Sequence, residues 1–315
     1  MRQEGRSPVG MTMIGVVGLF IAGFLMLVLF GAGSYRAAVA GQAENRDKRA
    51  VLSYLETCVK GGDTAGGVTI REGQTGPVLL IREGSSDYAL HIYAANGKLL
   101  EEYNRTGKNL CGAFLGKVME RAVKMGESNA CMKRIVAAPT AGSCGVIPAV
   151  LLSYEEYCKP SEYDLINALY VAAGIGKVIG ENASISGAFG GCQAEIGTAS
   201  AMAAGALAYL QGGDNAAIAN AAALALKNML GLACDPVGGL VEVPCVKRNS
   251  HGAVNAAASA QLALAGVKSA ISPDDVIDSM RRIGSEMPAS LKETGTGGLA
   301  ASESAKQLCG CIHQS

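Results

Sequence analysis

The stretch Ala199-Ser-Ala-Met-Ala-Ala-Gly-Ala-Leu-Ala208 decides the fold class of this chain. Small residues occupy nearly every position, so a helix formed here is small and apolar on most of its faces. A helix without a polar face has no side to turn towards water and is expected to be buried among other helices. The segment therefore predicts the centre of a helical bundle whose neighbouring helices pack closely against it.

Further helical runs surround this stretch, each of them broken by Gly or Pro. The predicted helices cover residues 111–125, 146–157, 162–180, 194–211, 214–230, 250–265 and 273–284, and one short strand is expected over 240–243. The last helix has Ser272 as its cap, Pro273 in its first turn, and two acids at the positive end of the helix dipole. Residues 107–315 are thus predicted to form a mainly α, Gly/Ala-rich helical domain.

The composition agrees with closely packed helices. The 315 residues include 42 Gly, 10 Cys and no Trp, so small and aliphatic side chains must fill the core. Lys and Arg number 27 and Asp and Glu also number 27, and this balance gives no sign of nucleic-acid binding. The cysteines form no CxxC pair, and the chain is longer than typical disulfide-stabilised domains. Buried thiols and metal ligands are the two interpretations that remain.

A first Gly-rich, polar segment covers residues 137–145 and reads Ala-Ala-Pro-Thr-Ala-Gly-Ser-Cys-Gly. Its glycines permit close approach of the backbone, and a helix is predicted to begin directly after it. The backbone N–H groups at the start of a helix bind carboxylates and phosphates. The segment is a candidate anion site, and the alternative is an ordinary Gly/Ser turn before a helix.

Two further Gly-rich segments, 182–195 and 234–249, carry Cys192, Cys234 and Cys245. Loop cysteines beside glycines can converge on an iron–sulfur cluster, because backbone amides can then reach the sulfur atoms. The spacings of 42 and 11 residues match no local cluster signature. From spacing alone, three buried thiols remain the alternative.

Three strings within these segments resemble the catalytic (alpha) chain of bacterial iron–sulfur L-serine dehydratases, which are L-serine ammonia-lyases. The strings are Arg134-Ile-Val-Ala-Ala-Pro-Thr-Ala-Gly-Ser-Cys-Gly145, Gly190-Gly-Cys-Gln-Ala-Glu195 and Leu232-Ala-Cys-Asp-Pro-Val-Gly-Gly-Leu-Val-Glu-Val-Pro-Cys-Val-Lys-Arg-Asn249. The similarity runs from about Gly107 to Thr296-Gly-Gly-Leu299. The resemblance implies a [4Fe–4S] cluster with Cys192, Cys234 and Cys245 as ligands, and no pyridoxal phosphate.

The same resemblance implies a mechanism. Three protein ligands leave one iron open as a Lewis acid for the serine hydroxyl, while a base removes the Cα proton. Elimination gives 2-aminoacrylate, which tautomerises and hydrolyses to pyruvate and ammonia. The substrate carboxylate is expected on the loop formed by Thr140, Ala141, Gly142, Ser143 and Gly145.

Other residues near these segments have weaker claims to a role. Lys247 is the candidate catalytic residue, with Arg248 beside it, and a solvated or ion-paired base is the alternative for both. His251 is expected to be structural, and Cys144 is expected to be a small loop residue near the substrate. The tail cysteines Cys309 and Cys311 are candidates for blocking the open iron in the resting state.

The amino-terminal residues 1–35 predict a tail and a membrane-spanning helix. No residue from 7 to 35 is charged, and the apolar part from 11 to 30 is long enough to cross a bilayer. A signal peptide is the alternative, although its apolar region covers only about 7–15 residues. Basic residues are more numerous after the span than before it, which places the catalytic part on the cytoplasmic side.

Residues 36–105 predict a polar helix followed by a small antiparallel β meander. The expected strands are 68–72, 78–83, 88–93 and 98–103, and Asn96-Gly97 between the last two is a strong hairpin signal. This order loosely resembles a pilin-like membrane-anchored module.

The predicted organisation is therefore a membrane helix over 1–35, a helix-and-sheet module over 36–105, and an N-terminally truncated catalytic domain over 107–315. The resemblance implies L-serine as substrate, a serine dehydratase beta (regulatory) chain as partner, and a homo-oligomer. If the N-terminal module is artefactual, the protein is expected in the cytoplasm without a membrane anchor. The alternative function is a membrane-anchored, non-catalytic protein that carries an inactive dehydratase remnant.

Overall fold

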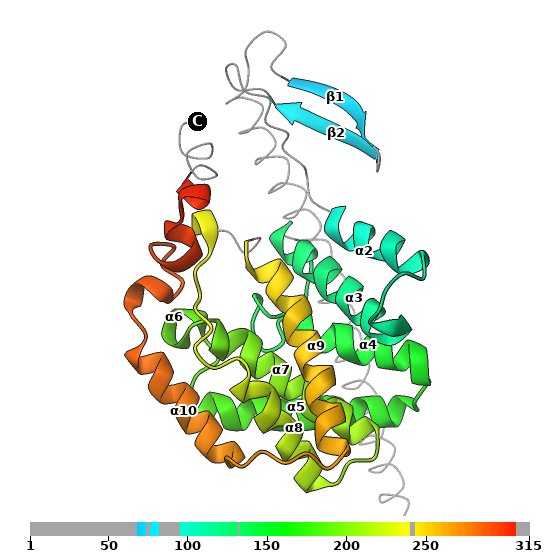
Figure 1. Cartoon of the computed structure of the whole chain (residues 1–315), viewed down its shortest axis with the longest axis vertical. Coiled ribbons are helices and arrows are strands. Elements are labelled where there is room, and N and C mark those ends of the chain that lie inside the picture. Colours follow the sequence, from blue (N-terminus) through cyan, green and yellow to red (C-terminus); the bar gives the residue numbers. More distant parts are fainter. Residues whose placement is uncertain (1–67, 74–75, 82–94, 132, 240–242, 307–315) are drawn as a thin grey trace, which may run out of the picture. The chain divides into compact units, whose positions relative to one another are not determined.

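The computed structural model describes residues 68–73, 76–81, 95–131, 133–239 and 243–306 (Figure 1). All of them belong to one compact unit of the chain, Cys58–Ser315. Its elements are β1 (Val68–Gly73), β2 (Gly76–Ile81), α2 (Ala95–Arg105), α3 (Gly112–Ala130), α4 (Val146–Cys158), α5 (Glu162–Asn182), α6 (Gly187–Gly190), the π-helix η1 (Gln193–Gly197), α7 (Thr198–Leu210), α8 (Asn215–Lys227), η2 (Val237–Gly239), α9 (Cys245–Leu264), α10 (Pro273–Glu286), η3 (Ala289–Leu291) and η4 (Gly298–Ala301). The predicted mainly helical class is confirmed.

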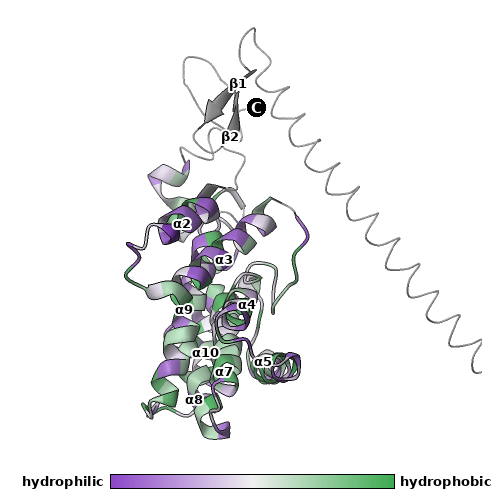
Figure 2. Cartoon of the chain, turned by 90° about the vertical axis from the view of Figure 1, so that its right-hand side faces the viewer, coloured by the Kyte–Doolittle hydropathy of each residue, from purple (hydrophilic) through white to green (hydrophobic). Residues whose placement is uncertain are grey.

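Helix α7 is the centre of the bundle, as its small residues predicted. Every residue from Thr198 to Ala208 is buried. Helices α4, α5, α8 and α9 all pack against α7, and α10 packs against α8. Figure 2 shows that α7 and α8 are mostly apolar, whereas α2 and α3 carry more hydrophilic residues. The small side chains of α7 allow four helices to share one central partner.

The predicted start of the last helix is confirmed in detail. Ser272 is the N-cap of α10, and its hydroxyl accepts a hydrogen bond of 3.1 Å from the backbone N–H of Asp275. Pro273 and two acids occupy the first turn. The local sequence was sufficient here because every feature acts within four residues.

The predicted strand over 98–103 is wrong, because these residues lie in helix α2. Asn96-Gly97 starts this helix and does not form a hairpin turn. The buried carboxylate of Glu127 on α3 accepts hydrogen bonds from the backbone N–H groups of Asn96, at 2.9 Å, and Gly97, at 3.2 Å. A carboxylate stabilises a helix N-terminus by satisfying free N–H groups. This long-range contact overrides the local turn signal.

The strands β1 and β2 form an antiparallel pair that runs from Val68 opposite Ile81 to Gly73 opposite Gly76. Two predicted strands are thus confirmed with small shifts at their ends. The predicted strand at 88–93 lies outside the described residues, as does most of the strand predicted at 240–243.

Among the described residues, none of the helices combines the length and apolarity needed to cross a bilayer. The apolar segment 11–30 lies outside those residues, so its membrane assignment stays a prediction.

Helix α9 approaches η1 and α4 closely at Gly252. A Cβ atom at this position would lie 2.7 Å from Cγ2 of Ile196 and 3.2 Å from Cγ2 of Val146. The hydroxyl of Ser200 donates a hydrogen bond of 2.8 Å to the Gly252 carbonyl. The absence of a side chain is therefore a packing requirement at this position.

We expect Gly252→Ala to lower the free energy of unfolding by about 1–3 kcal/mol, because overpacking forces neighbouring groups apart. Gly174→Ala is the matched control, since a Cβ atom at this site on α5 would meet open space. Alanine there should be neutral or raise stability by up to about 1 kcal/mol. Urea denaturation of both variants tests the difference, and equal stabilities would contradict the packing argument.

Candidate active site

The three predicted cluster cysteines meet in one place. Cys192 directly precedes η1, Cys234 lies in the loop after α8, and Cys245 is the first residue of α9. All three are buried. The sulfur of Cys192 is in hydrogen-bonding contact with the thiols of both Cys234 and Cys245. Three segments that are distant in sequence therefore bring their thiols together.

The backbone around Cys192 is held against the loop that carries Cys234. Gly191 has a φ angle of +77°, and a Cβ atom there would lie 2.8 Å from the carbonyl oxygen of Leu232. The backbone N–H of Gln193 donates to that same oxygen at 3.0 Å. The fully buried amide of Gln193 also accepts a hydrogen bond of 2.9 Å from the N–H of Gly231. The two segments are thus fixed relative to each other.

The C-terminal part of the described chain holds the other side of this loop. The N–H of Cys234 donates to the carbonyl of Leu291 at 2.8 Å, and the Cys234 carbonyl accepts from the N–H of Glu293 at 2.7 Å. The next carboxylate, that of Asp235, accepts a hydrogen bond of 2.8 Å from the N–H of Leu299. These contacts hold the loop that carries Cys234 and Asp235 against the segment that ends in Leu299.

Arg248 is the cation beside the sulfur atoms. Its guanidinium group forms an ion pair of 2.8 Å with the buried Asp235 and donates a hydrogen bond of 2.8 Å to the carbonyl of Ala233. The same group lies within hydrogen-bonding reach of Cys192. Asp235 therefore holds a positive charge next to the thiols.

The electrostatics of the three thiols show what they could bind. Hydrogen bonds from Cys234 and Cys245 lower the pKa of Cys192 to about 3, and nearby Arg248 acts in the same direction. The pKa values of Cys234 and Cys245 are raised well above the usual range, because each donates to Cys192 and is buried. The site tolerates one thiolate easily but needs additional positive charge to hold three. A thiophilic metal such as iron supplies that charge, so the donor set fits an iron–sulfur cluster.

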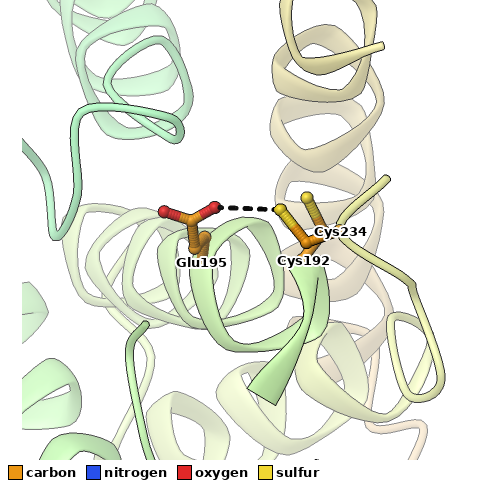
Figure 3. A group of neighbouring side chains, drawn as sticks. All are labelled: Cys192, Glu195 and Cys234. Carbon is orange, nitrogen blue, oxygen red and sulfur yellow. Dashed lines mark hydrogen bonds between the residues drawn. The ribbon is translucent and has the colours of Figure 1, made fainter. Parts of the chain in front are cut away.

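Glu195 is a site residue that the sequence interpretation did not single out. A carboxylate oxygen of Glu195 and the sulfur atoms of Cys192 and Cys234 all lie within 4.8 Å of one another (Figure 3). The sulfur of Cys234 is 4.0 Å from Oε2 of Glu195. The signal that could have found Glu195 is its position about one helical turn after Cys192.

The environment of Glu195 disfavours its ionised form. Burial raises the pKa of Glu195 to about 7, and the neighbouring Cys192 and Glu293 act in the same direction. A hydrogen bond with Thr140 opposes this shift. The carboxylate thus connects the sulfur atoms to the loop that contains Thr140.

The predicted substrate loop lies against the same carboxylate. A Cβ atom at Gly142 would be 3.2 Å from Oε2 of Glu195, so the glycine leaves space beside it. The hydroxyl of Thr140 is 3.1 Å from the hydroxyl of Ser143. Ser143 is fully buried, and its hydroxyl also accepts a hydrogen bond of 3.3 Å from the N–H of Thr140. The Ser143 hydroxyl is therefore engaged in shaping the loop.

Several N–H groups of this loop are already used inside the protein. The N–H of Gly145 donates to Oδ1 of Asn249 at 2.8 Å, and that of Cys144 donates to the carbonyl of Ala141 at 3.2 Å. Within the described part of the chain, the N–H groups of Ala141, Gly142 and Ser143 have no protein acceptor. Ala141 is exposed and Gly142 is half-buried, so their N–H groups are the accessible candidates for binding a carboxylate, whereas Ser143 is buried.

The other candidates lie less centrally. The side chain of Lys247 is exposed, and its carbonyl oxygen is 2.9 Å from Nδ1 of the exposed His251. Cys144 is buried with its sulfur 3.8 Å from the Met125 carbonyl, and burial raises its pKa to about 11. Cys309 and Cys311 lie outside the described residues, so their proposed role stays a prediction.

Comparison with known proteins agrees with the sequence motifs. The family model for the serine dehydratase alpha chain matches residues 78–300. The probable L-serine dehydratase alpha chain of Bacillus subtilis is 46% identical over 257 residues, which cover 82% of this chain and 79% of that protein. The L-serine dehydratase alpha chain of Peptoniphilus asaccharolyticus is 46% identical over 207 residues, or 66% of this chain and 71% of that protein. L-serine dehydratase 1 of Escherichia coli is 44% identical over 181 residues, which cover 57% of this chain and 40% of that protein.

The matched region begins earlier than the motifs indicated. The similarity was expected from about Gly107, whereas the family model already matches from residue 78 and therefore includes β2 from Val78 onward and all of α2. This part had been assigned to the pilin-like module. The hydrogen bonds between Glu127 and the start of α2 agree with its inclusion in the helical domain.

We expect Arg248→Met to lower the free energy of unfolding by about 3 kcal/mol, because the buried Asp235 keeps its charge without its partner. Lys247→Met is the matched control: it removes the same charge from the adjacent, exposed position and should change stability by less than about 0.5 kcal/mol. Urea denaturation of both variants measures the difference. Equal effects would show that the Arg248–Asp235 pair does not hold this loop.

Proposed function

The chain belongs to the serine dehydratase alpha-chain family, and we propose that it is a lyase that converts L-serine to pyruvate and ammonia with a [4Fe–4S] cluster held by Cys192, Cys234 and Cys245. The observation that carries the proposal is the convergence of these three buried thiols beside Glu195 and Arg248. The relatives named L-serine dehydratase support the reaction.

The thiols and their surroundings are suited to a cluster with three protein ligands. When bound in this way, a [4Fe–4S] cluster keeps one iron free of protein ligands and supplies a Lewis acid for the substrate hydroxyl. Arg248 stabilises the thiolate of Cys192, and Asp235 holds Arg248 in place. No pyridoxal phosphate takes part in this proposal.

The loop before α4 binds the carboxylate of L-serine in this proposal. The N–H groups of Ala141, Gly142 and Ser143 lie just before the first turn of α4, where the helix dipole favours a negative charge. Thr140 belongs to this loop as well, and its hydroxyl donates its one proton to the carboxylate of Glu195. Gly145 contributes through its lack of a side chain, since a Cβ atom there would lie 2.6 Å from the Ala122 carbonyl, and its N–H is bonded to Asn249.

Glu195 accepts the Cα proton at a carboxylate oxygen in this proposal. It contacts Thr140 of the carboxylate-binding loop on one side and the sulfur of Cys234 on the other. A substrate bridging these two regions places its Cα near Glu195. The C–O bond breaks as the Cα proton goes to Glu195, and the leaving hydroxide with the proton returned from Glu195 makes water, so the product is 2-aminoacrylate. This product tautomerises and hydrolyses to pyruvate and ammonia. Lys247 stays a second candidate for the base.

A beta chain is the proposed partner. The relatives of similar size are named alpha chains, and this chain spans only 40% of L-serine dehydratase 1 of Escherichia coli. The word alpha in the names of these relatives supports a companion beta chain. A homo-oligomer, a membrane anchor at residues 11–30 and a cytoplasmic catalytic domain complete the proposal.

Single replacements of Cys192, Cys234 or Cys245 by Ser should each abolish cluster assembly and pyruvate formation, because each removes one thiolate ligand. The chain is reconstituted anaerobically with iron and sulfide, and its visible absorbance, iron content and pyruvate production from L-serine are measured. Cys158→Ser is the control, because this exposed cysteine at the end of α4 lies outside the proposed site and should retain both cluster and activity.

The wild-type protein is assayed with and without the beta chain. Absence of cluster absorbance would reject the assignment of Cys192, Cys234 and Cys245 as cluster ligands. A cluster without pyruvate in the presence of the beta chain would favour the alternative of an inactive dehydratase remnant on a membrane-anchored protein.

Glu195 can be tested as the base by replacing its carboxylate. Glu195→Gln keeps the shape of the side chain but cannot accept the Cα proton, so kcat should fall by about 10²- to 10⁴-fold while cluster absorbance is kept. Glu293→Gln removes a neighbouring acid and should leave kcat within a few-fold of the wild type. Lys247→Met is assayed in parallel. An active Glu195→Gln protein together with an inactive Lys247→Met protein would assign the base to Lys247.

A further inference from the structure

Asn249 connects the substrate loop to a cluster ligand through one buried side chain. It lies on α9, four residues after Cys245, and only 1% of it is exposed. Its Nδ2 donates hydrogen bonds to the carbonyls of Gly142, at 2.7 Å, and Cys245, at 2.9 Å. Its Oδ1 accepts a hydrogen bond of 2.8 Å from the N–H of Gly145. One amide thus joins three backbone groups.

The orientation of this amide is determined by its partners. Both partners of Nδ2 are carbonyl oxygens, and the partner of Oδ1 is an N–H group. A flipped amide would place oxygen against oxygen and N–H against N–H. The side chain therefore accepts only one arrangement, and this arrangement fixes the distance between the loop and α9.

The loop cannot move independently of α9 at this point. A Cβ atom at Gly145 would lie 2.6 Å from the carbonyl of Ala122 on α3 and 2.9 Å from Oδ1 of Asn249. The Gly145 backbone is therefore pressed between two helices. Gly142, three residues earlier, is held at its carbonyl oxygen, while its N–H has no protein acceptor in the described part.

We propose that Asn249 is a positioning residue that sets the distance between the carboxylate-binding N–H groups of the loop and the Cys245 end of the cluster site. This inference rests on the proposed function and deepens it. A serine molecule is short, and its carboxylate and hydroxyl must reach both regions at once. Misplacement of one reactive partner by about 1 Å can reduce the rate by about 100-fold.

Asn249→Asp tests the inference with an isosteric change. The carboxylate keeps an acceptor for the Gly145 N–H but turns an oxygen towards the carbonyls of Gly142 and Cys245. Asn249→Ala removes the same two donors without adding a charge, so an effect shared by both variants cannot come from the new charge. We expect both variants to raise KM for L-serine, with a loss of about 100-fold in kcat/KM in the reconstituted enzyme.

Asn255→Asp is the matched control on the same helix. Nδ2 of Asn255 donates to the hydroxyl of Ser200 at 2.8 Å and to the carbonyl of Ala225 at 2.9 Å, and its Oδ1 accepts from Asn228 at 3.0 Å. This side chain joins α9 to α7 and to the α8 end of the bundle. Its replacement should lower the thermal midpoint and leave KM unchanged.

Two readouts besides activity separate positioning from stability. Hydrogen exchange of a peptide covering 138–146 should accelerate in both Asn249 variants of the metal-free protein and stay unchanged in Asn255→Asp. The iron content and visible absorbance of the reconstituted Asn249 variants should match those of the wild type. If Asn249→Asp fails to fold, Asn249→Ala and its hydrogen exchange still show whether Asn249 positions the loop.

An unchanged KM in the Asn249 variants, with loop exchange like that of the control, would overturn the inference. So would equal losses of stability and kcat in Asn249→Asp and Asn255→Asp, because that result describes a structural role only. If the wild-type enzyme makes no pyruvate with the beta chain, the proposed function is rejected instead. Hydrogen exchange of the loop would still show whether Asn249 holds the loop against α9.

Discussion

Three neighbouring thiols in a buried site cannot all ionise unless positive charge is present with them. In the protein alone, Cys192 takes the one favourable negative charge, and the pKa values of Cys234 and Cys245 are raised. Arg248, fixed by Asp235, offsets part of the charge. The remaining requirement for positive charge means that this set of thiols is suited to binding a metal. The glycine turns and the buried amides around the cysteines serve to hold this arrangement, which would not persist by itself.

The same packing that builds the bundle also builds this site. Helix α9 carries the thiol of Cys245, the amide of Asn249 and the side-chain-free Gly252 on successive turns. Gly252 lies against Ile196, and this residue belongs to the π-helix that follows Cys192. The close approach of α9 to η1 therefore brings Cys245 to Cys192. A bundle of larger side chains would hold these two segments further apart.

The sequence predicted what depends on local chemistry and missed what depends on distant contacts. The apolar surface of α7 and the cap at Ser272 act within a few residues, so both were predictable. Helix α2 was not, because the carboxylate that stabilises its start comes from a residue 31 positions later than Asn96. The meeting of the cysteines could not follow from spacings of 42 and 11 residues and came only from the resemblance. Glu195 stood inside a quoted motif, but its importance depends on neighbours from three segments.

The contacts of Glu195 specify where a substrate would react in the proposed enzyme. Thr140 contacts the carboxylate from the loop before α4, and Cys234 contacts it from the thiol side. L-serine has its carboxylate and its hydroxyl on opposite sides of Cα. An orientation with the carboxylate on the loop and the hydroxyl towards the cysteines therefore places Cα between them, beside Glu195. The reverse orientation would leave the N–H groups before α4 without a negative partner. Pairing of the substrate carboxylate with the loop therefore favours one direction of binding in the proposed enzyme, and in that direction the Cα proton lies next to the carboxylate of Glu195.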